Sequence, residues 1–145
     1  DLLPTLAEIT GADLPDKKID GVSLTELWKG NMEAEPRKDL WYYYGKNNLN
    51  AVRKGNWKLV FPHNYASYDA IPGNDGHAGP RYPRKVDSLE LYNLMRDPAE
   101  AYNVISLYPE KVSELQEVAQ KARYELGDLN QDMELGAENR EIGKL

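Results

Sequence analysis

Residues 49–61, "LNAVRKGNWKLVF", decide the fold because they hold two strand-forming segments joined by a short turn. The segments are residues 49–54 and 57–61, and the dipeptide Gly55-Asn56 between them is a two-residue hairpin signal. Along the second segment the side chains alternate, with Trp57, Leu59 and Phe61 on one face and Lys58 and Val60 on the other. This alternation predicts an antiparallel sheet that is covered mainly on one side.

Two more segments extend the hairpin into a sheet. Residues 39–44, "DLWYYY", are rich in aromatic side chains, and residues 89–94, "LELYNL", follow a long intervening loop. Residues 109–127 predict one long helix, opened by a proline and ended by a glycine, with apolar residues at helical spacing: Val112, Leu115, Val118, Ala119, Ala122 and Leu126. The expected class is α+β, with an antiparallel sheet of about four strands packed against one long C-terminal helix.

A short helix is expected at residues 1–11, before the sheet, and Gly11 suits its C-terminal end. Its apolar stripe has no obvious partner in the residues that follow: Leu2, Leu3, Leu6 and Ile9. We therefore expect poor burial of this stripe, or dimerisation through it. Residues 12–38 read mostly as loop, with one helical turn capped by Ser23 whose inward side chains are expected to be Leu24, Leu27 and Trp28.

Composition and charge narrow the function classes. The chain has 145 residues, a net charge of −6 and no cysteine. The acidic balance argues against binding to a nucleic-acid backbone, and no apolar run approaches the roughly 20 residues of a membrane span. Without cysteine the chain can form no disulfide, thiolate metal site or cysteine nucleophile.

The loop after residue 61 is the main functional signal in the residues themselves. It runs for about two dozen residues and contains both histidines, His63 and His77. Irregular loops longer than about 12–15 residues are usually functional or disordered. Its cationic, imidazole and phenol side chains suit a polar, anionic ligand, while a solvated loop with no binding role is the equal alternative.

Motifs for catalysis and metal binding are missing from the sequence. None of the five serines lies in a G-x-S-x-G elbow, and no zinc, EF-hand, phosphate-loop or dinucleotide pattern occurs. We therefore predict no catalytic residue and no metal ligand in this chain.

The order of several weak motifs is more specific than any one of them. These motifs are "DLLPTLAEITGADLP", "IDGVSLTELWKG", "AVRKGNWKLVF", "LELYNLMRDPAEAYNV" and "YPEKV". Together, over roughly residues 1–127, they resemble the C-terminal part of formylglycine-dependent sulfatases of the arylsulfatase and N-acetylgalactosamine-6-sulfatase type. In the "DP-x-E" motif, Glu100 is expected at a helix start, where negative charge is favoured.

The resemblance implies a division of labour. In such enzymes a large N-terminal domain carries the chemistry, with a formylglycine made from the first residue of a C/S-x-P-x-R motif and a calcium ion that polarises the sulfate. No serine here has that motif. The chain is thus expected to comprise the last helix of the catalytic domain at residues 1–12, the C-terminal subdomain at 13–127 and a mobile polar tail at 128–145. It should be inactive alone, with no cofactor of its own.

The resemblance also implies a role at the rim of the substrate cleft. By position, the expected substrate contacts are His63, Asn48, Arg81, Lys46 and His77, which would bind sugar hydroxyls or a second anionic group. The expected partners are the upstream catalytic domain and a sulfated saccharide or aryl sulfate. A periplasmic, secreted or lysosomal parent is implied by the resemblance alone. The loop at 63–88 is expected to be largely disordered in this chain. The alternative is a stand-alone binding or protein-interaction module.

Overall fold

The computed structural model describes residues 1–68, 76 and 79–133, and it divides the chain into two compact units, residues 1–38 and 39–145. The smaller unit contains helix α1 (Leu2–Thr10) and the one-turn helix α2 (Thr25–Trp28). Gly11 ends α1 with a φ of 73°, a left-handed conformation that glycine adopts without steric cost. The expected short helix is confirmed.

Thr5 organises the smaller unit from a fully buried position. Its hydroxyl donates to the Asp1 carbonyl at 2.6 Å and accepts from the Leu24 amide at 2.9 Å, so it ties α1 to the approach of α2. The apolar stripe of α1 is more than half exposed at every position, which confirms the expected poor burial. The inward orientation expected for Trp28 is wrong: it is 54% exposed, because the single turn of α2 buries Thr25 instead.

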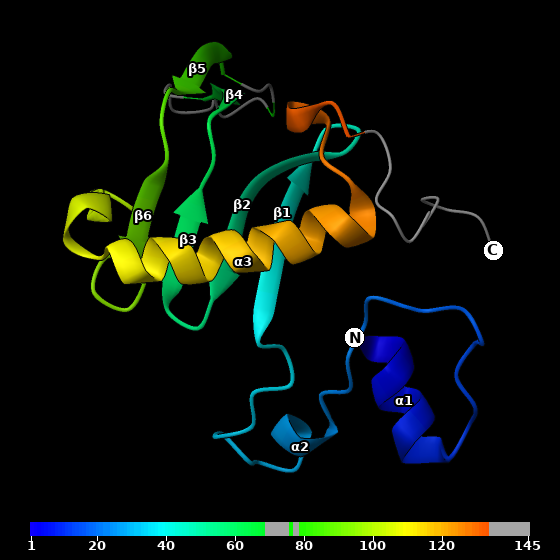
Figure 1. Cartoon of the computed structure of the whole chain (residues 1–145). Helices are drawn as coiled ribbons and strands as arrows, with labels where there is room; N and C mark the ends of the chain where they lie inside the picture. Colours follow the sequence, from blue (N-terminus) through cyan, green and yellow to red (C-terminus); the bar gives the residue numbers. More distant parts are fainter. Residues whose placement is uncertain (69–75, 77–78, 134–145) are drawn as a thin grey trace. The chain divides into compact units, whose positions relative to one another are not determined.

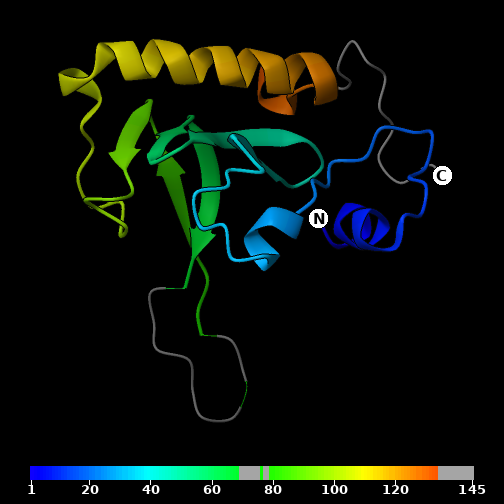
Figure 2. The same ribbon diagram turned by 90° about the horizontal axis from the view of Figure 1, so that it is seen from below.

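The larger unit is built on a four-stranded antiparallel sheet in the order β1-β2-β3-β6 (Figure 1). Its strands are β1 (Asp39–Tyr44), β2 (Asn48–Lys54), β3 (Trp57–Val60) and β6 (Glu90–Asn93). The helix α3 (Pro109–Leu126) crosses one face of this sheet (Figure 2). The predicted α+β class, the four strands and the long helix are confirmed.

The core lies between α3 and the sheet. It joins apolar residues of the strands, and Phe61 just after β3, to one stripe of the helix, all nearly or completely buried: Leu49, Val52, Leu59, Phe61, Leu91, Leu115, Val118, Ala119 and Ala122. Trp57 packs at its edge against Tyr108, with ring centroids 4.8 Å apart. The opposite sheet face carries only a small apolar cluster of Ala51, Val60 and Tyr92, as expected for a sheet covered mainly on one side.

A β-bulge in β2 sets which side chains reach each face. Tyr42 pairs with Ala51 and Tyr43 with Leu49, so Asn50 is an extra residue in the ladder. Leu49 and Val52 consequently both belong to the helix-side core although they are three residues apart, while Ala51 faces the other side.

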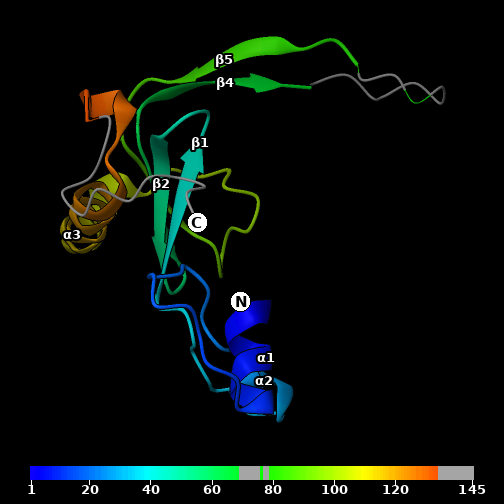
Figure 3. The same cartoon turned by 90° about the vertical axis from the view of Figure 1, so that its right-hand side faces the viewer.

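The segment after β3 is more ordered than expected. Strands β4 (His63–Ser67) and β5 (Tyr82–Val86) form a separate antiparallel ribbon, with His63 opposite Val86 and Ser67 opposite Tyr82. The ribbon extends to the side of the main sheet away from α3 (Figure 3). The expectation of a largely disordered loop is therefore wrong for both its ends, because backbone pairing orders them despite their polar side chains.

The chain after α3 folds back on the β1–β2 hairpin. The 3₁₀ turn η2 (Leu129–Gln131) follows Asp128, which is completely buried. The Leu129 amide donates to the Asn47 carbonyl, and the Tyr43 hydroxyl donates to the Gly127 carbonyl at 2.8 Å. The expected mobile tail is thus wrong for residues 128–133, and residues 134–145 lie outside the described part. No helix of the described residues is long and apolar enough to cross a membrane.

Candidate functional site

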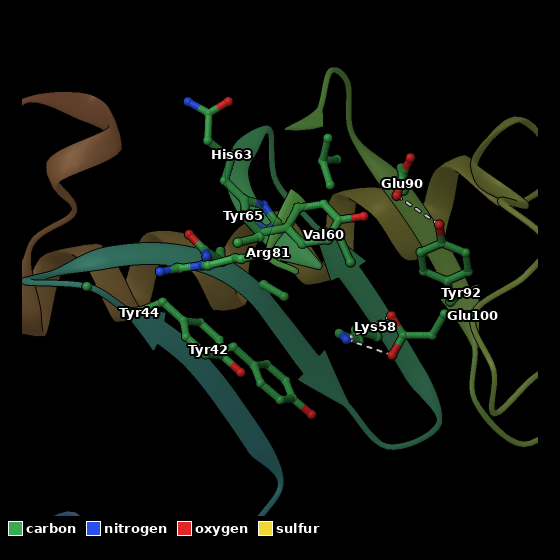
Figure 4. Close-up of a pocket in the computed structure, with 16 residues that line it drawn as sticks. Tyr42, Tyr44, Lys58, Val60, His63, Tyr65, Arg81, Glu90, Tyr92 and Glu100 are labelled. Atoms are coloured by element: carbon green, nitrogen blue, oxygen red, sulfur yellow. Dashed lines mark hydrogen bonds and ion pairs between the residues drawn. The ribbon is translucent and has the colours of Figure 1, made fainter. Parts of the chain in front are cut away.

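A groove of about 730 Å³ opens on the sheet face opposite α3 (Figure 4). The strands of the main sheet supply its floor, and the β4–β5 ribbon supplies one end. The side chains that define its chemistry are aromatic, cationic or acidic: Tyr42, Tyr44, Lys58, His63, Tyr65, Arg81, Glu90, Tyr92 and Glu100. Every lining residue belongs to the larger unit.

The β4–β5 ribbon and the residue before β5 contribute an oriented imidazole and a cation to the lining of the groove. Within the described ranges, Arg81 makes no ion pair, although it lines the groove. The Nδ1 atom of His63 lies 2.7 Å from the Phe61 carbonyl oxygen. Because that oxygen can only accept, Nδ1 carries the hydrogen, and the Nε2 atom of the neutral ring is left as an acceptor.

On the main sheet, the charged side chains that line the groove have partners within the groove. The Lys58 ammonium donates to both carboxylate oxygens of Glu100, at 2.6 and 2.8 Å, and lies 5.0 Å from the ring centroid of Tyr42. The Tyr92 hydroxyl donates to Glu90 Oε2 at 2.8 Å. Burial raises the pKa of Tyr92, and the bond to Glu90 raises it further, so this phenol stays neutral and the carboxylate stays paired.

Glu100 reaches its partner from a strained backbone position. Its φ is 54°, in the left-handed region that non-glycine residues adopt at a cost. The expected place at a helix start is wrong: Glu100 lies in the turn after β6, and the next helical turn, η1, spans Ile105–Leu107. The bidentate contact with Lys58 stabilises this conformation.

The predicted site residues separate into three groups. His63 and Arg81, 18 positions apart in sequence, both line the groove, although they lie at opposite ends of the ribbon, since His63 pairs with Val86 and Arg81 precedes Tyr82, the partner of Ser67. Lys46 and Asn48 lie on the β1–β2 hairpin beside the lining residues Tyr44 and Gly45, but they do not line the groove themselves. His77 lies outside the described residues.

Sequence reasoning missed the floor of the groove. Lys58 was assigned to the sheet face away from the core, but nothing predicted its partner Glu100, 42 residues later. Tyr44 lies in a run of aromatic residues that favours strand core, yet it is 62% exposed at the groove. The alternation of side chains along the strands was the only available signal for both.

The described part of the chain offers no group of three or more His, Asp or Glu side chains that could hold a metal ion. The calcium ion that the resemblance implies therefore finds no fitting ligand set among these residues.

The comparisons with known proteins identify the family. A model of the C-terminal region of aryl-sulfatase matches residues 35–142. Human arylsulfatase A is 36% identical over 110 residues, which cover 72% of this chain and 21% of the relative. Steryl-sulfatase of Mus musculus is 36% identical over 110 residues, covering 69% and 18% of the two chains. The chain belongs to the sulfatases, whose members hydrolyse sulfate esters, and it spans about a fifth of the length of these curated relatives.

Solved structures share the fold. One is BT33336S-sulf, described with the metabolism of multiple glycosaminoglycans by Bacteroides thetaiotaomicron. It matches with a TM-score of 0.57 at 26% identity, covering 85% of this chain and 24% of its own. BT4656, solved with its substrate D-glucosamine-2-N,6-O-disulfate, matches with a TM-score of 0.54 at 23% identity and covers 85% and 23%. The second likeness shows the fold alone.

Proposed function

We propose that this chain forms the substrate rim of a sulfatase that acts on sulfated carbohydrates, and that its side chains select the substrate without taking part in bond cleavage. The observation that carries the proposal is the groove shared by His63 and Arg81. Both come from a segment that contributes little to the core, so their placement serves something other than packing. A cation and an oriented acceptor suit a sugar that bears both an anionic group and hydroxyls.

Sulfate-ester cleavage itself is assigned to residues outside this chain. The chain has no cysteine, and none of its serines lies in the C/S-x-P-x-R motif that the family converts to formylglycine. When present, formylglycine supplies the nucleophile and calcium polarises the sulfate. The residues of this chain would bind and orient the remainder of the substrate, and the chain alone would show no sulfatase activity.

The test joins this chain in frame to the catalytic portion of a sulfatase and measures turnover of sugar sulfates. We expect His63→Ala to raise KM by about tenfold or more with a smaller effect on kcat, because it removes a binding contact and no reacting group. If sugar-sulfate turnover stays within about twofold of the parent, the role of His63 is contradicted.

Lys85→Gln is the matched control for charge. Lys85 lies on strand β5 of the ribbon and is paired with Asp87 at the surface. It does not line the groove. Its replacement should leave KM unchanged. Sulfatase activity of the isolated chain above background would contradict the assignment of the chemistry to another part of the enzyme.

A stand-alone interaction module is the second candidate function. The observation that favours it is the exposed apolar stripe of α1, where Leu2 is 65% and Leu6 is 51% exposed. A reading frame that continues upstream of Asp1 and encodes C/S-x-P-x-R would favour the sulfatase role over this alternative.

A further inference from the structure

We propose that the post-helix turn, residues 127–133, is a working part of the substrate rim. It holds the hairpin tip, residues 44–48, in the conformation that places Tyr44 at the groove. Asn47 and Asp128 are then positioning residues, which act on a substrate through Tyr44 and not by touching it. This inference deepens the proposed function and rests on it for the effect on turnover, but the order of the hairpin tip can be measured without any substrate.

The post-helix turn is closed on itself, so it can serve as a fixed partner. The Asp128 amide donates to the Met133 carbonyl at 2.8 Å, and the Met133 amide donates back to the Asp128 carbonyl at 3.0 Å. The Asn130 amide donates to Asp128 Oδ1 at 3.0 Å, and Arg123 Nε donates to Asp128 Oδ2 at 2.9 Å. The turn is therefore tied both internally and to the last residues of α3.

Asn47 fastens the hairpin tip to this turn with its side chain and its backbone. The side-chain amide donates to the carbonyl of Leu126, the last residue of α3, and the Asn47 carbonyl accepts from the Leu129 amide at 2.9 Å. Figure 1 shows the segment after α3 beside the loop that joins β1 to β2. Two bonds at one residue fix the path of the tip rather than a single point of it.

The β-bulge adds a third bond, in the interior. The pairing of β1 with β2 shifts register after Tyr42, and just beyond this shift the Leu49 amide donates to Asp128 Oδ1 at 3.1 Å. This bond is buried, where a lost partner costs more than it does in water. The bulge and the post-helix turn therefore act together on the strand that leaves the tip.

Tyr43 carries the constraint through the sheet to the groove, because successive side chains of a strand point to opposite faces. Tyr43 packs against the helix-side core and its hydroxyl donates to the Gly127 carbonyl at 2.8 Å, whereas Tyr44 lines the groove. The Tyr44 side chain is 62% exposed and has no hydrogen-bond partner among the described residues, so the backbone of β1 sets where its ring lies. Anchoring that backbone in advance reduces the ordering that a ligand must impose.

The first experiment compares Asn47→Ala with Asn103→Ala in the 145-residue chain. Each variant removes a side chain that bonds to the backbone of another segment, since Asn103 Oδ1 accepts from the Leu91 amide at 3.0 Å at the β6 edge of the sheet. NMR relaxation of the amide nitrogens gives the order parameters of residues 44–46. We expect Asn47→Ala to lower them from about 0.85 to below about 0.6, and Asn103→Ala to leave them unchanged.

Three further variants separate position from stability. Asp128→Asn keeps an acceptor for the Leu49 amide and should preserve the order of the hairpin tip, whereas Asp128→Ala should lose it. Leu91→Ala is the control for lost stability, because it removes a buried side chain on β6 and leaves the post-helix turn intact. If Asp128→Ala does not fold, Asn47→Ala decides the question.

The second experiment measures turnover of sugar sulfates after this chain is joined to the catalytic portion of a sulfatase. We expect Asn47→Ala to raise KM about threefold or more with a smaller effect on kcat, because the loosened tip must be ordered again on binding. Asn103→Ala should change neither constant.

An unchanged tip in Asn47→Ala would overturn the inference, and so would equal loosening in Asn103→Ala or Leu91→Ala. His63→Ala separates this inference from the proposed function. If His63→Ala raises KM and Asn47→Ala does not, only the inference is contradicted. If neither variant raises KM while Asn47→Ala still loosens the tip, the proposed function is contradicted, and the link between the post-helix turn and the hairpin tip stands.

Discussion

Asp128 shows how much one side chain can do at the end of a helix. It is completely buried, and its Oδ1 accepts from the Leu49 amide at 3.1 Å and the Asn130 amide at 3.0 Å. Its Oδ2 accepts from Arg123 Nε at 2.9 Å. A single carboxylate thus links α3, β2 and η2, and its charge is compensated by Arg123, whose side chain is only 14% exposed.

Replacing Asp128 should therefore be costly. We expect Asp128→Ala to lower the free energy of unfolding by about 3–5 kcal/mol, because it leaves Arg123 buried without its partner. Asp128→Asn keeps one acceptor and should cost less. Urea unfolding measures both, with Asp87→Ala as the control, since the Lys85–Asp87 pair is exposed and worth at most about 1 kcal/mol. Equal effects of the Asp128 and Asp87 variants would contradict this role.

Glu100 couples backbone strain to an ion pair, and the two can be separated by a double-mutant cycle. In a Lys58→Met background, Glu100→Gly should stabilise the fold by about 1 kcal/mol, because glycine adopts the positive φ without strain. With Lys58 present, the same change also removes the ion pair and should stabilise less or destabilise. Additive effects of the two substitutions would show that the pair does not hold the strained residue.

The buried hydroxyl of Tyr43 should make the free energy of unfolding fall at alkaline pH. Burial raises the pKa of its hydroxyl above the ordinary value of 10.0, and Asp128 raises it further. A phenol whose pKa is raised in the folded state contributes stability that is present below pH 10 and lost as the pH rises above it. Tyr43→Phe should flatten this alkaline loss in urea unfolding, whereas Tyr124→Phe, at an exposed tyrosine, should leave it unchanged. An unaltered pH profile in Tyr43→Phe would contradict the assignment.

Single residues also mark the limit of what the sequence predicts. The Gly55-Asn56 turn and the alternation of Trp57, Leu59 and Phe61 are local signals, and the structure confirms the hairpin that they predict. The conformation of Glu100 depends on Lys58, which is distant in sequence, so no local signal reveals it. The sequence predicts Arg81 and His63 as contacts of one rim, but it does not predict the β4–β5 ribbon from which they line the groove.

Among the secondary-structure elements, the β4–β5 ribbon differs most from expectation. Its strands carry polar and exposed residues such as Asn64, Arg84 and Lys85, a composition typical of loops. The stabilisation comes from backbone pairing across residues far apart in sequence, which side-chain periodicity does not encode. By contrast, the bounds predicted for α3 differ from those of the structure by about one residue, because the spacing of its apolar side chains is a local signal.

The ribbon should also be the least stable of these elements. A two-stranded ribbon with mostly exposed side chains has little apolar burial to protect it. In native-state hydrogen exchange we expect amides of β4 and β5 to exchange at least about tenfold faster than those of β2 and β3. A saccharide that binds the groove should slow the ribbon selectively. Equal protection of ribbon and sheet would contradict this ranking.

At the scale of the whole molecule, the exposed stripe of α1 sets the association behaviour. Four large apolar side chains on one short helix exceed what scattered surface residues explain: Leu2, Leu3, Leu6 and Ile9. We expect the chain to self-associate through this stripe at high concentration, and Leu6→Lys to shift it to a monomer.

Sedimentation over a range of concentrations checks this expectation. Because Leu6 is 51% exposed, the substitution should leave the thermal unfolding of the monomer nearly unchanged. Lys17→Leu is the control: if the stripe alone is responsible for self-association, this substitution should not shift the chain to a monomer. A monomer at every concentration, with α1 ordered, would contradict self-association through this helix.

The bulge at Asn50 has a consequence for how this strand tolerates change in length. The extra residue changes which positions of β2 face the helix. Before the bulge the odd-numbered Leu49 faces α3, and after it the even-numbered Val52 faces α3. Deleting Asn50 would restore strict alternation, with Leu49 and Val52 still facing α3 and Ala51 still facing the groove. A deletion of one codon at the bulge should thus keep both faces of the sheet, whereas a deletion elsewhere in β2 would leave the bulge in place and exchange the faces of the residues on one side of the cut.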